Sequence, residues 1–278
     1  MRRGGSGRAL LLAALVTTFA ACDGAPPPDS VSAAYDYPAG GAACTTPPAT
    51  PASGDSTIDT GDHLDVLVRV PRNYRPDVAH PLLVVYAAAG MTPAASEHLT
   101  GYTPLGTARG FVVAYARHVR PSRAAIAKLA RVPAAVAAHY CVDAAHVFVS
   151  GHSDGGTTST AVATMPETSA RVAGLAPSAA GFTGADLATF ACPAPRPVLV
   201  WHGARDSLFP GYGREAAAWW ANCNGCDATA PPAVDGCVHY AGCRAPVQYC
   251  EGDYGHLSWP PLGAARSLEF FERSMRTP

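Results

Sequence analysis

Short, continuous apolar runs recur along the chain and predict buried β-strands. Residues 81–87, 111–115 and 146–150 are apolar at almost every position, as strands covered on both faces of a sheet are. Residues 171–177 and 197–202 show the same pattern in shorter form. These runs indicate a sheet whose central strands have no face open to water.

Two further strands and a set of helices complete the pattern. Residues 64–70 alternate between apolar and polar positions, which is typical of an antiparallel strand at a sheet edge, and residues 247–250 form the last strand. The predicted helices are 102–108, 124–140 with a break at Pro133, 157–165, 214–221 and 263–275. Because strands and helices alternate, we expect an α/β fold with a mostly parallel central sheet and helices on both faces.

The N-terminus has the features of an export signal. Basic residues, including Arg8, precede the apolar run 9–21, which is too short to span a membrane. Residues 1–21 are therefore expected to be a signal peptide. Small residues before Cys22 resemble a bacterial lipobox, in which Cys22 becomes lipidated and attaches the protein to a membrane. Phe19 replaces the usual leucine, so cleavage by an ordinary signal peptidase is the alternative.

Composition separates a linker from a folded domain. Residues 22–55 are rich in proline, glycine, alanine and threonine, and are expected to form a tether between membrane and domain. Residues 56–278 are expected to form one catalytic domain. The net charge of −1 over 278 residues gives no electrostatic footprint for nucleic acid, so no nucleic-acid partner is expected.

The cysteine count suits an oxidising compartment. The chain has 9 cysteines, and without Cys22 an even set remains, enough for four disulfides. Eight cysteines allow about 105 pairings, so the sequence does not fix the connectivity, although Cys44 is placed to pin the linker to the domain. The alternative is a zinc site on the closely spaced Cys223 and Cys226 with later cysteines. Export favours disulfides, and no metal is expected.

The stretch from Gly151 to Gly155 reads G-x-S-x-G, with Ser153 at its centre, between the predicted strand 146–150 and the predicted helix 157–165. A serine exposed on such a tight turn needs glycine on either side, because side chains there would collide. The turn also directs the amide of Asp154 towards an attacked carbonyl. A chance match in a glycine-rich chain is the alternative, and the flanking elements favour a nucleophile.

A serine nucleophile needs a base and an acid further along the chain. Asp206 follows the strand 197–202, and His256 follows the last strand, so both lie at the carboxyl ends of strands, where the serine also lies. Asp253 is the alternative acid.

Other histidines are expected to have other roles. His152 should pack beneath the serine turn, and His202 should orient the Asp206 loop. His239 is expected to be structural or exposed, and the remaining histidines are expected on the surface.

A resemblance can now be named. The segments 151–156, 201–206 and 141–143, with Gly255-His256 and Trp259-Pro260, resemble the secreted α/β-hydrolase group of polyhydroxybutyrate depolymerases and feruloyl or acetylxylan esterases. The similarity covers about residues 56 to 275. It implies an α/β-hydrolase fold with Ser153 as nucleophile, His256 as base and Asp206 as acid.

Two positions depart from this group. The group has a Leu-His-Gly turn where this chain has the alanine run 87–89, and a backbone donor needs no particular side chain, so Ala88 or Ala89 is expected to supply the second oxyanion amide beside that of Asp154. The group also places one residue between the histidine and Trp-Pro, whereas two residues precede Trp259 here. Trp259, Tyr254 and Tyr212 are expected to contact the substrate.

The sequence thus predicts an exported serine carboxylesterase that uses neither cofactor nor metal. Its expected partner is an ester, either a hydroxyalkanoate polyester or oligomer, or a feruloyl or acetyl ester of plant polysaccharide. An inactive hydrolase scaffold that serves as a surface binding module is the alternative of another class, suggested by the altered oxyanion turn. A peptidase with the same triad is a further alternative.

Overall fold

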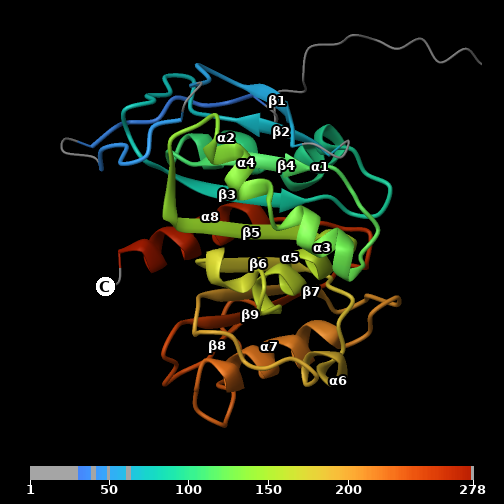
Figure 1. Ribbon diagram of the computed structural model, residues 1–278. Helices are drawn as coiled ribbons and strands as arrows, with labels where there is room; N and C mark the ends of the chain where they lie inside the picture. Colours follow the sequence, from blue (N-terminus) through green and yellow to red (C-terminus); the bar gives the residue numbers. More distant parts are fainter. Residues whose placement is uncertain (1–30, 39–41, 49–50, 61–63, 277–278) are drawn as a thin grey trace, which may run out of the picture.

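The computed structural model describes residues 31–38, 42–48, 51–60 and 64–276. Within these residues the strands form one nine-stranded sheet in the order β1-β2-β4-β3-β5-β6-β7-β9-β8 (Figure 1). The strands are β1 (Ser56–Asp59), β2 (Asp65–Arg69), β3 (His80–Tyr86), β4 (Val112–Ala116), β5 (Val142–His152), β6 (Gly174–Ser178), β7 (Val198–Gly203), β8 (Cys237–His239) and β9 (Val247–Gly252).

The six strands from β4 to β9 in this order pair in parallel, while β1, β2 and β8 add antiparallel pairs at the two edges. The predicted mostly parallel sheet is confirmed. Parallel pairing brings the carboxyl ends of β5, β7 and β9 to one edge, so the loops after these strands gather there.

Helices cover both faces of the sheet, as predicted (Figure 1). They are α1 (Pro93–Thr100), α2 (Tyr102–Thr107), α3 (Arg123–Leu129), α4 (Val132–Ala137), α5 (Asp154–Thr164), α6 (Gly184–Leu187), α7 (Tyr212–Cys223) and α8 (Gly263–Met275). Alternate residues of a strand point to opposite faces. Val84 of β3 accordingly packs in the core beneath α3, α4, α5 and α7, and its neighbour Val85 packs in the core beneath α2 and α8.

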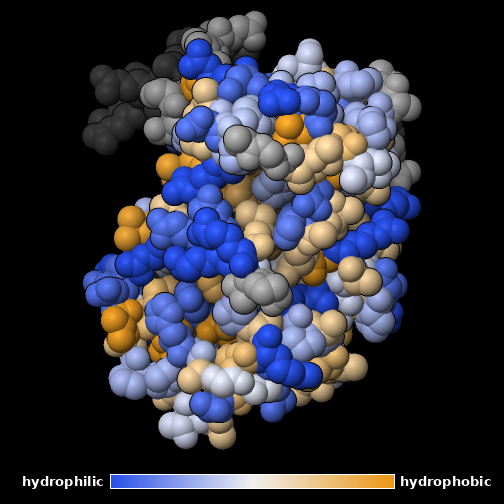
Figure 2. Space-filling view, turned by 90° about the vertical axis from the view of Figure 1, so that its left-hand side faces the viewer, coloured by the Kyte–Doolittle hydropathy of each residue, from blue (hydrophilic) through white to orange (hydrophobic). Residues whose placement is uncertain are grey.

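Among the described residues, no helix has the length and apolar character needed to cross a membrane. Figure 2 shows one side of the molecule, where hydrophilic residues are interspersed with smaller apolar groups. The apolar faces of the sheet are instead buried under the helices.

The edges of the sheet differ from the sequence prediction. Residues 64–70 were expected to form an edge strand, and this was wrong, because β1 pairs outside β2. The sequence of β1 is Ser-Thr-Ile-Asp, in which only Ile58 is apolar and buried, so no hydrophobic run marked it. The three-residue strand β8 and the helices α1 and α6 also escaped prediction.

The described parts of the predicted linker lie against the domain. Ser32 is only 6% exposed, and its hydroxyl donates to the carboxylate of Asp55 at 3.1 Å. Residue 43 forms an isolated antiparallel bridge to residue 78. A free tether makes no such contacts, so the tether expected over 22–55 does not hold for residues 31–38 and 42–48. The predicted signal peptide and Cys22 lie outside the described residues.

Four disulfides join the eight cysteines that the sequence assigned to such bonds. The pairs are Cys44–Cys141, Cys192–Cys223, Cys226–Cys243 and Cys237–Cys250. The alternative zinc site would have used Cys223 and Cys226 together, but these belong to different disulfides. Cys44 joins the N-terminal segment to the residue before β5, as expected, and the set fits an oxidising compartment.

Candidate active site

Ser153 lies on the tight turn between β5 and α5, with a φ of 54° and a ψ of −116°. A non-glycine residue with such a φ is strained, and strain of this kind clusters at active sites. A Cβ atom at Gly151 would overlap the backbone of Gly155, and one at Gly155 would overlap the carbonyl of Tyr86. Glycine is therefore required at both positions, for the reason that the motif suggested.

The residues predicted from three distant segments meet at this turn. Ser153 Oγ lies 2.8 Å from His256 Nε2, and His256 Nδ1 lies 2.8 Å from Asp206 Oδ2. The imidazole Nδ1–H donates to the carboxylate, which leaves Nε2 free to accept the serine hydroxyl. This is the tautomer that a general base needs.

Backbone amides fix the orientation of the Asp206 carboxylate. Its Oδ1 accepts from the amides of Leu208 and Phe209, each at 2.9 Å, while Oδ2 faces His256. Burial acts to raise the pKa of Asp206, but the hydrogen bonds from His256 and from the two amides outweigh it and hold that pKa below its usual value. The acid is therefore ionised at neutral pH.

The alternative residues lie elsewhere. The side chain of Asp253 is 86% exposed and pairs with Arg205 at 2.8 Å, so the alternative acid does not contact the imidazole. His239 is an exposed residue of β8, as expected.

Two buried histidines form hydrogen bonds to the backbone of the loops that carry His256 and Asp206. His152 Nε2–H donates to the carbonyl of His256 at 2.6 Å, and its Nδ1 accepts from the hydroxyl of Ser178 at 3.1 Å. His202 Nε2–H donates to the carbonyl of Phe209 at 2.9 Å. His152 thus packs under the turn and holds the His256 backbone, while His202 anchors the loop that carries the acid, and both match their predicted roles.

Because His152 is buried, its titration makes the free energy of unfolding depend on pH. Burial lowers its pKa to about 4, and burial also lowers the pKa of His80 and His202. Between the folded pKa near 4 and the unfolded value near 6.5, the unfolded chain binds a proton that the folded chain does not. Stability therefore falls as the pH drops through this window, by about 3 kcal/mol for His152 alone.

We expect the melting temperature to fall from pH 7 to pH 4, and to fall less steeply in the His152→Gln variant. His239→Gln is the matched control, because it removes an exposed histidine. Equal slopes for the wild type and His152→Gln would contradict the assignment.

The two predicted oxyanion segments lie side by side. Asp154 is the first residue of α5, so its amide has no partner within the helix. Gly155 packs directly on the backbone of Tyr86, which places the loop after β3 against the serine turn. In that loop the carbonyl of Ala88 accepts from the amide of Met91 at 3.0 Å. Among the described residues, no hydrogen bond uses the amides of Ala88 or Ala89, and their role at the oxyanion stays a prediction.

The sequence interpretation missed His118, which was expected on the surface. His118 Nε2–H donates to the Asp154 carboxylate at 2.9 Å, and the backbone amide of His118 donates to the carbonyl of Met91 at 3.3 Å. One residue thereby connects both segments that carry the predicted oxyanion amides. Its position shortly after β4, at the carboxyl edge of the sheet, was the signal that could have found it.

We expect His118→Ala to lower kcat about 10- to 100-fold with little change in KM, because the Asp154 carboxylate is then free to turn towards the developing negative charge. His118→Gln should recover part of the loss, since its amide can also donate to Asp154. Steady-state kinetics on a p-nitrophenyl ester measures both variants. An unchanged kcat in His118→Ala would rule out this positioning role.

The predicted substrate-contacting aromatics have different surroundings. Tyr212 stacks on Phe209 with ring centroids 5.4 Å apart, and Phe209 meets the His256 ring edge-on at 4.9 Å. Tyr254 packs over Gly203 and Gly252, and burial raises its pKa. Tyr212 is thus one ring removed from the imidazole, and Tyr254 packs beside the loop that carries Asp206.

Trp259 contacts His152 edge-on at 6.2 Å and Tyr102 at 5.7 Å. It therefore packs behind the triad, against the histidine that holds the His256 backbone. A substrate contact of Trp259, Tyr254 or Tyr212 stays a prediction.

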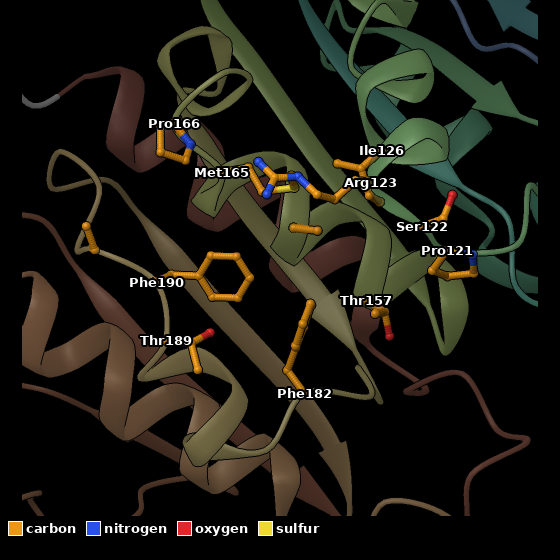
Figure 3. A pocket seen from close by; sticks show the side chains of 12 residues that line it. Pro121, Ser122, Arg123, Ile126, Thr157, Met165, Pro166, Phe182, Thr189 and Phe190 are labelled. Atoms are coloured by element: carbon orange, nitrogen blue, oxygen red, sulfur yellow. The ribbon is translucent and has the colours of Figure 1, made fainter.

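A cavity of about 600 Å³ that the sequence did not indicate lies along α5 (Figure 3). We call it the α5 groove and define it by its apolar side chains and one threonine: Ile126, Thr157, Ala161, Met165, Phe182 and Phe190. Its residues come from three separate segments, which is why no single motif marked it. Thr157 lies one helical turn beyond Ser153, so the groove begins next to the serine turn.

The structure is similar to solved esterases. One is an acetyl xylan esterase from Aspergillus awamori, with a TM-score of 0.59 and 19% identity over 79% of this chain and 99% of that chain. Another is a thermophilic esterase from the planctomycete Thermogutta terrifontis with bound butyrate, with a TM-score of 0.55 and 16% identity over 79% and 92% of the two chains. A third is the Thermogutta terrifontis esterase 2 phosphorylated by paraoxon, with a TM-score of 0.55 and 17% identity over 79% of this chain and 92% of that chain.

No protein-family model matches the sequence, and no curated protein sequence matches it. At these identities the similarity to solved structures concerns the fold. The chain has the α/β-hydrolase fold that the sequence predicted.

Proposed function

We propose that this chain is an exported serine carboxylesterase. The observation that carries the proposal is the unbroken hydrogen-bonded series from Ser153 through His256 to Asp206, with the serine on a strained turn. The three residues also occur along the chain in the order serine, acid, histidine, which is typical of this fold. The scaffold alternative does not require this alignment.

The geometry supports an acyl-enzyme mechanism. His256 Nε2 takes the proton of Ser153 as its oxygen attacks the ester carbonyl, and Asp206 stabilises the imidazolium. The amides of Asp154 and of Ala88 or Ala89 hold the oxyanion, each donor contributing about 2.7–4 kcal/mol to lowering the barrier. His256 then protonates the departing alcohol, and water activated by the same histidine releases the acid and restores the serine.

Similar structures support the ester as substrate. One is described as an acetyl xylan esterase, one holds butyrate, and one was phosphorylated by paraoxon. These properties belong to those proteins, and for this chain they favour an ester bond over a peptide bond.

A hydroxyalkanoate polyester or its oligomers is the substrate that we propose, with feruloyl or acetyl esters of plant polysaccharide as the alternative. Leu257 and Leu208 support an apolar substrate, because they adjoin His256 and the Asp206 loop and are 88% and 61% exposed. Release of hydroxybutyrate from oligomers, without ferulate or acetate from xylan, is the expected result of a product assay. The reverse result would favour the polysaccharide esters.

Export is part of the same proposal. Four disulfides support an oxidising compartment, and a signal peptide over 1–21 with lipidation at Cys22 would place the enzyme on the outer side of a membrane.

A further inference from the structure

The α5 groove follows one stripe of a single helix. Thr157, Ala161 and Met165 are spaced by four residues and therefore lie on the same face of α5 and its end. At 1.5 Å per residue, this stripe is about 12 Å long. Figure 3 shows Phe182 and Phe190 on one side of the groove and Ile126 on the other. We refer to the groove as a slot, because a stripe of this length along one helix gives room for an extended group.

The slot is lined mostly by apolar side chains, and the one charged side chain among the described lining residues, Arg123, is 83% exposed and pairs with Glu167 at 3.0 Å. The rings of Phe182 and Phe190 meet edge-on with centroids 6.0 Å apart, and Met165 and Ile126 complete the apolar lining. The apolar walls gain free energy from burying apolar groups. A sugar hydroxyl placed here would lose its hydrogen bonds to water.

The hydroxyl groups that line the groove already have partners in the protein. Thr157 Oγ1 donates to the carbonyl of Ser153 at 3.0 Å and accepts from the amide of Gly181 at 2.8 Å. Ser122 Oγ accepts from a helix amide at 3.1 Å, and Thr189 Oγ1 donates to a helix carbonyl at 2.6 Å. These bonds hold the walls in place, and each hydroxyl already uses part of its hydrogen-bonding capacity within the protein.

The end of the groove at Thr157 lies one helical turn from Ser153, and neither Ser153 nor His256 itself lines the cavity. Thr157 bonds the backbone of Ser153 directly. Gly181, which precedes Phe182, lies against the ring of Phe209, and that ring contacts His256. A chain attached to a carbonyl at Ser153 would enter the slot only if it is long enough to pass Thr157.

We propose that the α5 groove binds the apolar chain of the ester, so that the enzyme prefers esters with an extended aliphatic or aryl group over acetyl esters. The inference rests on the proposed esterase function and deepens it. Each methylene buried in the slot should raise kcat/KM about fourfold until the slot is filled. An acetyl group would leave most of the slot empty.

Two series of substrates test the proposal. One lengthens the acyl group of p-nitrophenyl esters from acetate to octanoate, and the other lengthens the alcohol of acetate esters from ethyl to octyl. The series that shows the rise in kcat/KM identifies which side of the ester occupies the groove. A wild-type enzyme that hydrolyses acetate esters but gains nothing from chain length in either series overturns the groove and leaves the esterase proposal standing.

Groove variants locate the effect. Ala161→Phe should narrow the slot and lower the octanoate-to-acetate ratio of kcat/KM at least tenfold. Ala185→Phe is the matched control, because Ala185 is an exposed residue of α6 outside the groove, and it should keep the wild-type ratio. Phe190→Ala removes one apolar wall and serves as the second variant if Ala161→Phe does not fold. A folded groove variant with the wild-type ratio overturns the proposal, and hydrolysis of no ester by the folded wild type overturns both proposals.

Discussion

Replacement of Ser153 by alanine is expected to lower kcat by about 10⁶-fold, the largest effect of any single substitution in this chain. The hydroxyl oxygen is the atom that bonds to the substrate, and among the described residues no other side chain is hydrogen-bonded to His256 Nε2 and able to give it a proton. The fold should persist, because alanine has a Cβ like serine and meets the same backbone strain at a φ of 54°. Hydrolysis of p-nitrophenyl acetate measures the loss, and the melting temperature reports the fold.

Undiminished hydrolysis by a folded Ser153→Ala variant would refute the assignment of the nucleophile. A residual rate somewhat above that of water is compatible with it, because bound substrate still meets the oxyanion amides.

Replacement of Asp206 by asparagine is expected to lower kcat by about 10⁴-fold. The amides of Leu208 and Phe209 require an oxygen at the position of Oδ1. The asparagine amide nitrogen must then face His256 Nδ1 and donate to it. This reverses the imidazole tautomer, so that Nε2 carries the proton and no longer accepts one from Ser153.

Asp253→Asn is the matched control for this prediction. It removes a carboxylate close to His256 in sequence but exposed and paired with Arg205 in space, and we expect near-wild-type kinetics. A larger loss in Asp253→Asn than in Asp206→Asn would make the alternative acid the functional one.

The sequence alone was sufficient for the parts of the site that local backbone geometry dictates. Gly151 and Gly155 flank Ser153 because side chains there would overlap neighbouring backbone, and such a requirement is visible in a short motif. Buried parallel strands are equally visible as apolar runs. Their carboxyl ends share one edge, so Asp206 and His256 could be expected to lie near the serine.

Other features formed by distant residues were not predicted, because no motif or apolar run marks them. The bond from His118 to Asp154 joins residues 36 positions apart, and the walls of the α5 groove come from separate loops and helices. Disulfide pairing depends on the same long-range geometry, which the number of cysteines does not contain. The His118–Asp154 bond, the groove and the disulfide pairs become apparent once the order of the strands in the sheet is known.

The N-terminal segment shows the limit of composition most clearly. Its proline and glycine content predicted a tether, because it has few apolar residues to bury. In the described ranges the segment is instead held by backbone and side-chain hydrogen bonds and by the Cys44–Cys141 disulfide. Such contacts depend on the surface of the domain against which the segment lies, so the composition of the segment alone does not indicate them.

A fluorophosphonate probe tests the central claim most directly, since it reacts with a serine only when a neighbouring base has activated it. The full-length protein, labelled and digested, should carry one adduct on the peptide that contains Ser153, and the Ser153→Ala and His256→Ala variants should remain unlabelled. A folded wild-type protein that takes up no probe, or an adduct on a different serine that persists in Ser153→Ala, would contradict the account.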